Sequence, residues 1–210
     1  MSVFEWLTIF FVCTIGAMTP GPSLIVIIFI NNSKNFMSGF FASLGHGAGI
    51  IIYALISIFS LTFILNILPF TIPLIQLLGA VFLVYIGYKI IFLKSSKEPS
   101  TLKTKSPNTI LESFFVGLTT SLINPKAMIF FSSIFSQFIN EDYNLYTKYG
   151  MALLAGIIDS SWYILVSYSA SINFVQNFIK SKQSLIFLTL GMTLITFSFY
   201  LSYKSFKYFI

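Results

Sequence analysis

The sequence predicts an all-α integral membrane protein with six transmembrane helices in two inverted three-helix repeats, helices one and four being broken by proline motifs. Three observations support this fold class: the composition, the number of long apolar segments, and a proline motif that recurs in each half. Of the 210 residues, 56% are apolar and 9% are charged, with a mean hydropathy of +0.88. Soluble domains carry about a quarter charged residues, so the composition indicates a protein that faces lipid.

Six apolar segments are long enough to cross a bilayer, which takes about 20 residues. They occupy residues 4–31, 39–64, 70–93, 110–139, 147–171 and 184–203. Because no ten-residue alternation of polar and apolar residues occurs, the sequence argues against a transmembrane barrel. The first segment lacks a basic start, so it is interpreted as a retained helix rather than a signal peptide.

One polar stretch divides the chain, and its Lys, Ser and Pro content is typical of a flexible linker. We therefore expect a first repeat over residues 1–93, a linker over 94–109 and a second repeat over 110–210, all within one membrane domain. Because each half crosses the membrane an odd number of times, the second half would be inverted relative to the first. Pro22 and Pro125 stand 103 positions apart, close to the length of one repeat.

Lysine placement predicts the orientation, since cytoplasmic loops of membrane proteins are enriched in basic residues. All twelve basic residues are lysines, eight of them following helices one, three and five and three on the opposite face. The linker is therefore expected in the cytoplasm and both termini outside. The net charge of +6 is explained by this topology, and no nucleic-acid partner is expected.

The two proline motifs are "MTPGPS" at 18–23 and "INPKA" at 123–127. A lone proline in a membrane helix usually marks a simple kink, and that interpretation stays open. Two prolines around Gly21 favour an unwound segment instead. In the second motif, Asn124 has the chemistry of an N-cap and Pro125 suits the first helical position.

Each motif would thus create the N-terminus of a half-helix inside the bilayer. Such an end presents free backbone N–H groups and a partial positive charge, which favour an anion, most simply a carboxylate. The residues predicted to bind substrate at these ends are Thr19, Pro20, Gly21, Pro22, Asn124, Pro125 and Lys126, together with Asp159 of the fifth helix.

Lys126 and Asp159 both lie near the middle of predicted helices, where a charge costs at least about 2.5–3.5 kcal/mol. One interpretation is a structural pair between them. The other is a divided site, in which Lys126 and the helix ends take a carboxylate while Asp159 takes an ammonium group or carries a proton. A zwitterion satisfies both charges, so the second interpretation points to an amino acid.

His46 lies in "SLGHGAGI", where Gly45, Gly47 and Gly49 predict close packing of helices. His46 is either a packing histidine or, with Asp159, a candidate for proton coupling. Gly79 and Gly87 are expected to make further helix contacts. The G-x-x-x-G pattern formed by Gly45 and Gly49 serves either internal packing or a homo-oligomer.

The segments that carry these residues resemble the lysine exporter and homoserine/threonine resistance (LysE/RhtB) family along nearly the whole chain. The matching pieces are "TPGPS", "SGFFASLGHGAG", "LLGAVFLVYIGYKII", "SFFVGLTTSLINPKAMIFFSSIFSQF" and "GIIDSSWYILVSY". Two residues depart from the family pattern. Thr19 stands where many members have Gly or Ser, and Ser136 stands where Pro is usual, which predicts a straighter end to the fourth helix.

The resemblance implies a multi-pass secondary carrier of the bacterial inner membrane that exports amino acids or their derivatives, driven by proton antiport. It implies that the two proline motifs and Asp159 form the site, with no enzymatic activity and no cofactor. Exporters of metals or other small solutes belong to the same superfamily and remain the alternative. Soft metals need clusters of Cys, Met or His, and the chain has one Cys and one His.

Two further classes fit less well. An intramembrane hydrolase needs paired aspartates, a serine–histidine setting or an H-E-x-x-H motif, and none of these patterns occurs. A purely structural membrane subunit would leave two broken helices and two charges within the bilayer unexplained.

Overall fold

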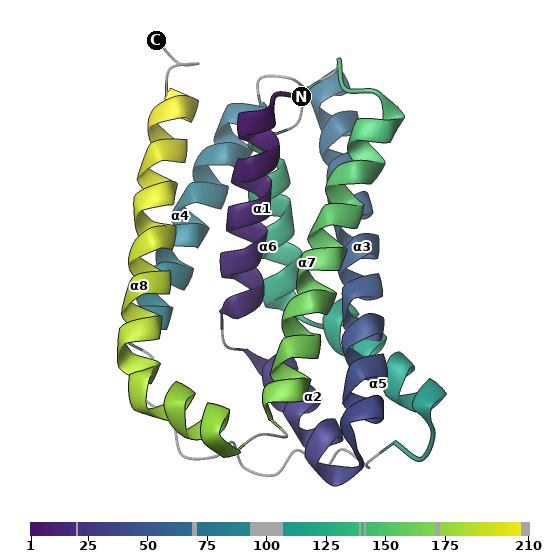
Figure 1. Cartoon of the computed structure of the whole chain (residues 1–210). Helices are drawn as coiled ribbons and strands as arrows, with labels where there is room; N and C mark the ends of the chain where they lie inside the picture. The colour runs from purple at the N-terminus through teal and green to yellow at the C-terminus, as the bar shows by residue number, and fades with distance from the viewer. Residues whose placement is uncertain are drawn as a thin grey trace.

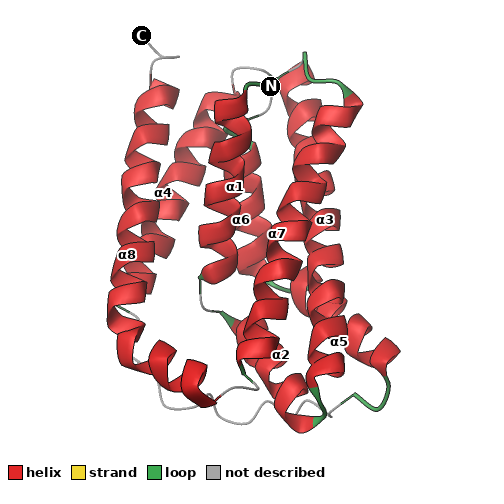
Figure 2. Ribbon diagram, viewed as in Figure 1, coloured by secondary structure: helices red, strands yellow, loops and turns green. Residues whose placement is uncertain are grey.

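The computed structural model describes residues 1–19, 21–68, 71–92, 107–138, 140, 142–170 and 173–206. The secondary structure of these residues is helical throughout (Figure 2). The helices are α1 (Val3–Met18), α2 (Pro22–Ser33), α3 (Phe36–Ile67), α4 (Ile72–Ile91), α5 (Ile110–Leu122), α6 (Pro125–Phe135), α7 (Leu145–Ser169) and α8 (Asn173–Phe206). Most of the predicted linker and Pro20 lie outside the described residues.

The helices form one bundle in which two helix pairs are bent at the proline motifs (Figure 1). The bend is 62° between α1 and α2 and 63° between α5 and α6. The two termini lie at the same end of the bundle, and the chain enters α5 from the opposite end (Figure 1).

By length and composition, α3 and α7 are each able to cross a membrane, and each bent pair also qualifies if it is taken as one span. In α4 and α8 the described apolar stretches are shorter, Pro73–Lys89 and Leu188–Tyr200. Two to four candidate spans in an all-helical chain agree with an integral membrane protein. The six-span inverted repeat stays a prediction.

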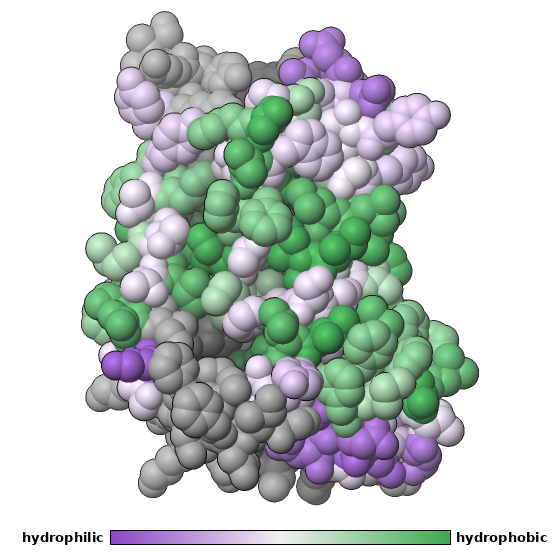
Figure 3. Space-filling model, in the orientation of Figure 1, coloured by the Kyte–Doolittle hydropathy of each residue, from purple (hydrophilic) through white to green (hydrophobic). Residues whose placement is uncertain are grey.

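The surface supports the membrane assignment. Figure 3 shows a broad apolar band around the middle of the visible face, with polar residues gathered toward the two ends. Large apolar side chains are exposed on several helices, including Phe11, Phe63, Leu78 and Ile157. Lipid tails would cover these side chains without the cost of exposing them to water.

Two helix ends differ from the predictions. The last helix begins at Asn173 rather than near 184, and Figure 1 shows its first turns lying across the end of the bundle before the helix turns along it. No proline or glycine stands between Asn173 and residue 184, so nothing in that stretch stops a helix. Lys182, predicted in a loop, is therefore helical. Ser136 does not extend α6, because the helix ends at Phe135 and the next residues form a turn.

The close packing predicted for the glycines is confirmed where α3 crosses α5. A Cβ atom on Gly45 would collide with the carbonyl oxygen of Phe114, and one on Gly117 with the carbonyl oxygen of Ala42. Gly49 faces Ser121 of the same helix, α5. Among the described residues the G-x-x-x-G pattern thus serves internal packing.

Two further crossings are built from reciprocal glycine pairs. Between α3 and α7, a Cβ on Gly47 or Gly156 would press on the carbonyl oxygen of the other. Gly87 and Gly191 form the same arrangement between α4 and α8. Helices at such crossings approach closely enough for the backbones to touch, which fixes their positions along each other.

Replacing Gly117 by alanine should destabilise the bundle by about 1–3 kcal/mol, the usual cost of overpacking. The added Cβ would meet the backbone of Ala42, which cannot rotate away. Thermal unfolding of the detergent-purified protein measures the effect. Gly21→Ala is the matched control, because the nearest atom to its Cβ would be the Lys126 Nζ at 3.5 Å, an ordinary contact. Equal melting temperatures for both variants would contradict the packing argument.

Candidate functional site

Both proline motifs start a helix inside the bundle. α6 begins at Pro125 with Asn124 as its N-cap, and the Asn124 Oδ1 accepts the Lys126 backbone N–H at 3.0 Å. α2 begins at Pro22 with Gly21 as its N-cap. The helix start predicted at N-P-K and the unwinding predicted at T-P-G-P are both confirmed.

The two starts differ in how they are capped. Gly21 has no side chain, so α2 has no side-chain hydrogen bond at its N-cap, whereas α6 has the one from Asn124. The first N–H groups of a helix have no partner within the helix, and together they carry a partial positive charge. The N-terminus of α2 is therefore the better prepared of the two for an anion.

The two breaks lie side by side, about half-way along the bundle (Figure 1). The Asn124 Nδ2 donates to the Ser23 Oγ at 3.0 Å, and the Lys126 Nζ donates to the Thr19 carbonyl oxygen at 2.7 Å. These two hydrogen bonds join segments that are about half the chain apart in sequence.

Lys126 is stabilised here by backbone rather than by a carboxylate. Its acceptor, Thr19, is the C-cap of α1, and carbonyl groups at a helix C-terminus carry partial negative charge. Gly21 lies beside the ammonium group on the α2 side, where a Cβ would be 3.5 Å from the Nζ. Lys126 therefore stands between the negative end of α1 and the positive end of α2.

Asp159 is paired with His46, the Nδ1 of His46 lying 2.6 Å from the Asp159 Oδ2. Asp159 is 5% exposed on α7 and His46 is 2% exposed on α3. The structural pair of Lys126 with Asp159 is not formed, because the Asp159 carboxylate is paired with His46 and the Lys126 Nζ donates to the Thr19 carbonyl oxygen. From the sequence, Asp159 was expected either to pair with Lys126 or to take a substrate ammonium group or a proton. Its pairing with His46 was not predicted.

One nitrogen of this buried pair has no partner. The His46 Nε2 is the sole buried side-chain nitrogen or oxygen without a hydrogen bond in the described part of the chain. With Asp159 accepting from Nδ1, a neutral imidazole presents Nε2 as a hydrogen-bond acceptor. An unpaired buried acceptor costs about 1–3 kcal/mol, and a proton or a water molecule would remove that cost.

Polar side chains connect the pair to the breaks. The His46 ring lies against Tyr163, with ring centroids 4.6 Å apart, and the Tyr163 hydroxyl lies near the Ser23 side chain. Ser23 in turn accepts from Asn124. A series of neighbouring polar side chains therefore runs from Asp159 to Asn124 through the interior of the bundle.

Sequence reasoning missed Ser23 and Tyr163, and it did not join His46 to Asp159. The positions of the glycines could have predicted the pairing of His46 with Asp159. His46 stands between Gly45 and Gly47, and Gly156 precedes Asp159 by nearly one turn. Reciprocal contact of Gly47 with Gly156 brings α3 and α7 close at the level of both polar residues.

Ser23→Ala should lower the free energy of unfolding by about 1–3 kcal/mol, because it leaves the partly buried Asn124 amide without its acceptor. Ser60→Ala is the control, since the exposed Ser60 hydroxyl bonds only within its own helix. Chemical denaturation in mixed micelles compares the two. A Ser23 variant as stable as the Ser60 variant would show that this contact does not hold the breaks together.

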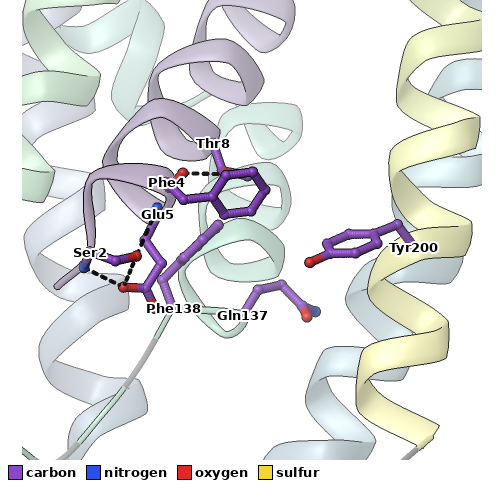
Figure 4. Close-up of a pocket in the computed structure, with 7 residues that line it drawn as sticks. All are labelled: Ser2, Phe4, Glu5, Thr8, Gln137, Phe138 and Tyr200. Carbon is purple, nitrogen blue, oxygen red and sulfur yellow. Dashed lines mark hydrogen bonds between the residues drawn. The ribbon is translucent and has the colours of Figure 1, made fainter.

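Two cavities lie at the end of the bundle that carries the termini, and neither includes a residue of the breaks. One, of about 270 Å³, is lined by Ser2, Phe4, Glu5, Thr8, Gln137, Phe138 and Tyr200 (Figure 4). The other has a similar volume and is lined mainly by apolar side chains of α1 and α8. In the described segments no group of three His, Cys, Asp or Glu side chains is placed to hold a metal ion.

The sequence profile of the LysE type translocator family matches residues 14–205. The chain belongs to this family. The matched range includes both breaks, His46 and Asp159, and it confirms the resemblance stated from the motifs. LysE type translocators are transporters, so this chain is a membrane transporter and not an enzyme.

The names of proteins similar in sequence to this chain are consistent with this family. The threonine efflux protein of Escherichia coli strain K12 is 26% identical over 166 residues, which cover 77% of this chain and 80% of the relative. The leucine efflux protein of Klebsiella pneumoniae is 26% identical over 190 residues, 88% of this chain and 86% of the relative. No solved structure matches the chain significantly.

Proposed function

We propose that this LysE family translocator exports small amino acids or their derivatives from the cytoplasm by proton antiport. Two supports come from outside the site: membership of the family, and relatives named for threonine and leucine efflux. The observation that carries the proposal is the pairing of two broken helices around Lys126, connected by polar side chains to a buried carboxylate. The Lys126 ammonium group and the Asp159 carboxylate, connected by polar side chains, suit a zwitterionic substrate.

The carboxylate of the substrate binds at the breaks. There it meets the Lys126 ammonium group and the positive end of α2, where the Ser23 backbone N–H follows a proline and an N-cap without a side chain. Lys126 exchanges its hydrogen bond to the Thr19 carbonyl for one to the substrate, and the absent side chain at Gly21 leaves room for this. The carboxylate site consists of Thr19, Pro20, Gly21, Pro22, Asn124, Pro125 and Lys126.

Asp159 and His46 carry the ammonium group and the proton. When Asp159 is ionised it attracts the substrate ammonium, and when it is protonated that attraction is lost and the substrate leaves. His46 holds one carboxylate oxygen and has a second nitrogen able to accept a proton. Proton binding from outside and proton loss to the cytoplasm would then drive substrate in the outward direction.

The architecture proposed for this cycle is two inverted repeats, residues 1–93 and 110–210, joined by the linker 94–109 and rocking around a midplane site. Its support is the similarity of the two halves. The bends are 62° and 63°, and the reciprocal glycine pairs join helices that are equivalent in the two repeats. The paired glycines stand 109 and 104 positions apart, near the 103 positions between Pro22 and Pro125.

The proposed setting is the bacterial inner membrane, with the linker in the cytoplasm and both termini outside. The lysine distribution favours this orientation. The common end of the two termini in Figure 1 is compatible with it.

Export from proteoliposomes tests the function. Vesicles carrying the purified protein are loaded with a mixture of free amino acids that includes threonine and leucine, and a pH gradient is imposed. Mass spectrometry identifies what leaves. We expect selective efflux that depends on the gradient and is absent from protein-free vesicles. Efflux equal to that of empty vesicles for every amino acid would contradict the proposal.

A further inference from the structure

Each helix break leaves one backbone carbonyl without its helical partner. In a continuous helix, the carbonyl oxygen of one residue accepts the N–H of the residue four positions later. Thr19 and Leu122 each stand three residues before the proline that starts the next helix, and they are 103 positions apart. The Thr19 carbonyl accepts the Lys126 ammonium group. The Leu122 carbonyl accepts the Tyr53 hydroxyl. The two equivalent carbonyls are thus bound by donors from other helices, one charged and one neutral.

Neutral groups close the second break. The Lys126 backbone N–H, which a continuous helix would direct to the Leu122 carbonyl, donates to the Asn124 Oδ1 at 3.0 Å instead. The preceding carbonyl, that of Ser121, accepts the Asn124 N–H at 3.1 Å. The Leu122 carbonyl released by this cap is the one that accepts the Tyr53 hydroxyl. The N-cap of α6 and the last turn of α5 are therefore both held by short hydrogen-bonded contacts.

α3 runs without interruption past both halves of this broken helix (Figure 1). Residues four apart lie on one face of a helix. On that face of α3, Gly45 and Gly49 pack against α5, and Tyr53 reaches the last residue of α5. One turn later the Ser57 Oγ lies 3.3 Å from the Ser132 Oγ of α6. Tyr53 thus bonds at the bend itself, where the neighbour of α3 changes from α5 to α6.

The first break is held in a different way. Its carbonyl, that of Thr19, is bound by the Lys126 Nζ, a charged group at the end of a long, flexible side chain. The N-cap of α2 is Gly21, which offers no side-chain acceptor. In the proposed cycle Lys126 leaves the Thr19 carbonyl for the substrate carboxylate, so the hydrogen bonding of the first break changes each time a substrate binds.

We infer that Tyr53 is a positioning residue, whose hydroxyl fixes the second break so that substrate binding alters the first break alone. Lys126 is the second residue of α6, so a change in the bend between α5 and α6 would move its ammonium group relative to Thr19. Tyr53 acts through this bend and does not touch the substrate. The inference rests on the proposed function, because it assigns the fixed and the changing parts of that site.

Distances between spin labels test each break without requiring transport. In a Cys13→Ser background, Leu111→Cys and Met128→Cys carry labels on exposed positions of α5 and α6. Phe11→Cys and Ser33→Cys form the matched pair on exposed positions of α1 and α2. Double electron–electron resonance on the full chain in lipid nanodiscs then reports the two bends separately.

Tyr53→Phe removes only a hydroxyl, and it should widen the distance distribution across the second break to about twice its width, because the Leu122 carbonyl loses its donor. Tyr88→Phe is the matched control, since Tyr88 is exposed on α4, and it should leave the distribution unchanged. With Tyr53 intact, the amino acid that the wild type exports, threonine or leucine, should shift the distribution across the first break and leave that of the second as it is.

Transport supplies a readout that a general loss of stability would not reproduce. In Tyr53→Phe the threonine or leucine concentration for half-maximal efflux should rise about tenfold, because the Lys126 ammonium group is misplaced. The maximal rate should stay close to that of the wild type. Inhibition by the corresponding amino alcohol, threoninol or leucinol, should be nearly unchanged, since these compounds have no carboxylate for Lys126 to bind.

Three outcomes would each overturn the inference: a second break as narrowly distributed in Tyr53→Phe as in the wild type, a response of the second break to the exported amino acid, or equal losses of affinity for amino acid and amino alcohol. Failure of the export proposal is distinguishable from these. Absence of amino-acid efflux from the wild type, with the second break widened in Tyr53→Phe, would overturn export and keep Tyr53 as the residue that fixes the bend.

Discussion

Replacing Asp159 by asparagine is expected to lower amino-acid efflux by about 10- to 100-fold and to remove its dependence on the pH gradient. Asparagine has nearly the same shape and can still accept from the His46 Nδ1, so the packing of α3 on α7 is kept. It has no charge to attract an ammonium group and binds no proton. Loss of a hydrogen bond to a charged group costs about 1.5–3 kcal/mol. Since each 1.4 kcal/mol corresponds to about a tenfold change, this cost equals the expected 10- to 100-fold loss of efflux.

Efflux rates from proteoliposomes over external pH 5 to 8 measure this effect. Asp142→Asn is the matched control, because Asp142 is exposed in the connection between α6 and α7, and it should export like the wild type. An Asp159 variant that exports at the wild-type rate across this range would refute both the ammonium and the proton roles of Asp159.

Replacing Lys126 by methionine is expected to lower efflux by a similar factor through loss of carboxylate binding. Methionine keeps most of the side-chain length but has no ammonium group to donate. It also leaves the Thr19 carbonyl without its side-chain donor, so some loss of stability accompanies the loss of transport. Thermal unfolding of the purified variant measures that second effect separately.

Competition by a substrate analogue isolates the carboxylate. The wild type should be inhibited more strongly by the exported amino acid than by the corresponding amino alcohol, which lacks a carboxylate. The Lys126→Met variant should lose this preference. Lys148→Met is the control, since Lys148 is a buried lysine in the first turn of α7, away from the breaks. A preference unchanged in the Lys126 variant would assign this lysine to structure alone.

The local features of the breaks were predictable from sequence because they depend on neighbouring residues. Proline at the first helical position, asparagine as its cap and glycine between two prolines act within one turn of the chain. The membrane class followed from composition for a similar reason, since lipid selects apolar surface everywhere along the helices.

The partners across helices were not predictable in the same way. Lys126 was expected to bind either Asp159 or a substrate carboxylate. In the structure it donates to the Thr19 carbonyl oxygen instead, because the C-terminus of α1 ends beside it. The pairing of His46 with Asp159 depends on where two glycines let α3 and α7 cross. The cavity around Glu5 joins the first turn of α1 to Gln137 and Tyr200, and no periodicity links such distant residues.

The partners of α3 also bear on how the chain is synthesised. Its closest packing is with α5 and α7, both of which follow it in the sequence. We therefore expect α3 to enter the membrane with His46 and its flanking glycines facing lipid or the insertion machinery. Asp159 arrives later and finds its partner already in place. Joining the two halves would then be the step that makes a carboxylate acceptable in the bilayer, so a chain without His46 should be inserted less efficiently at α7.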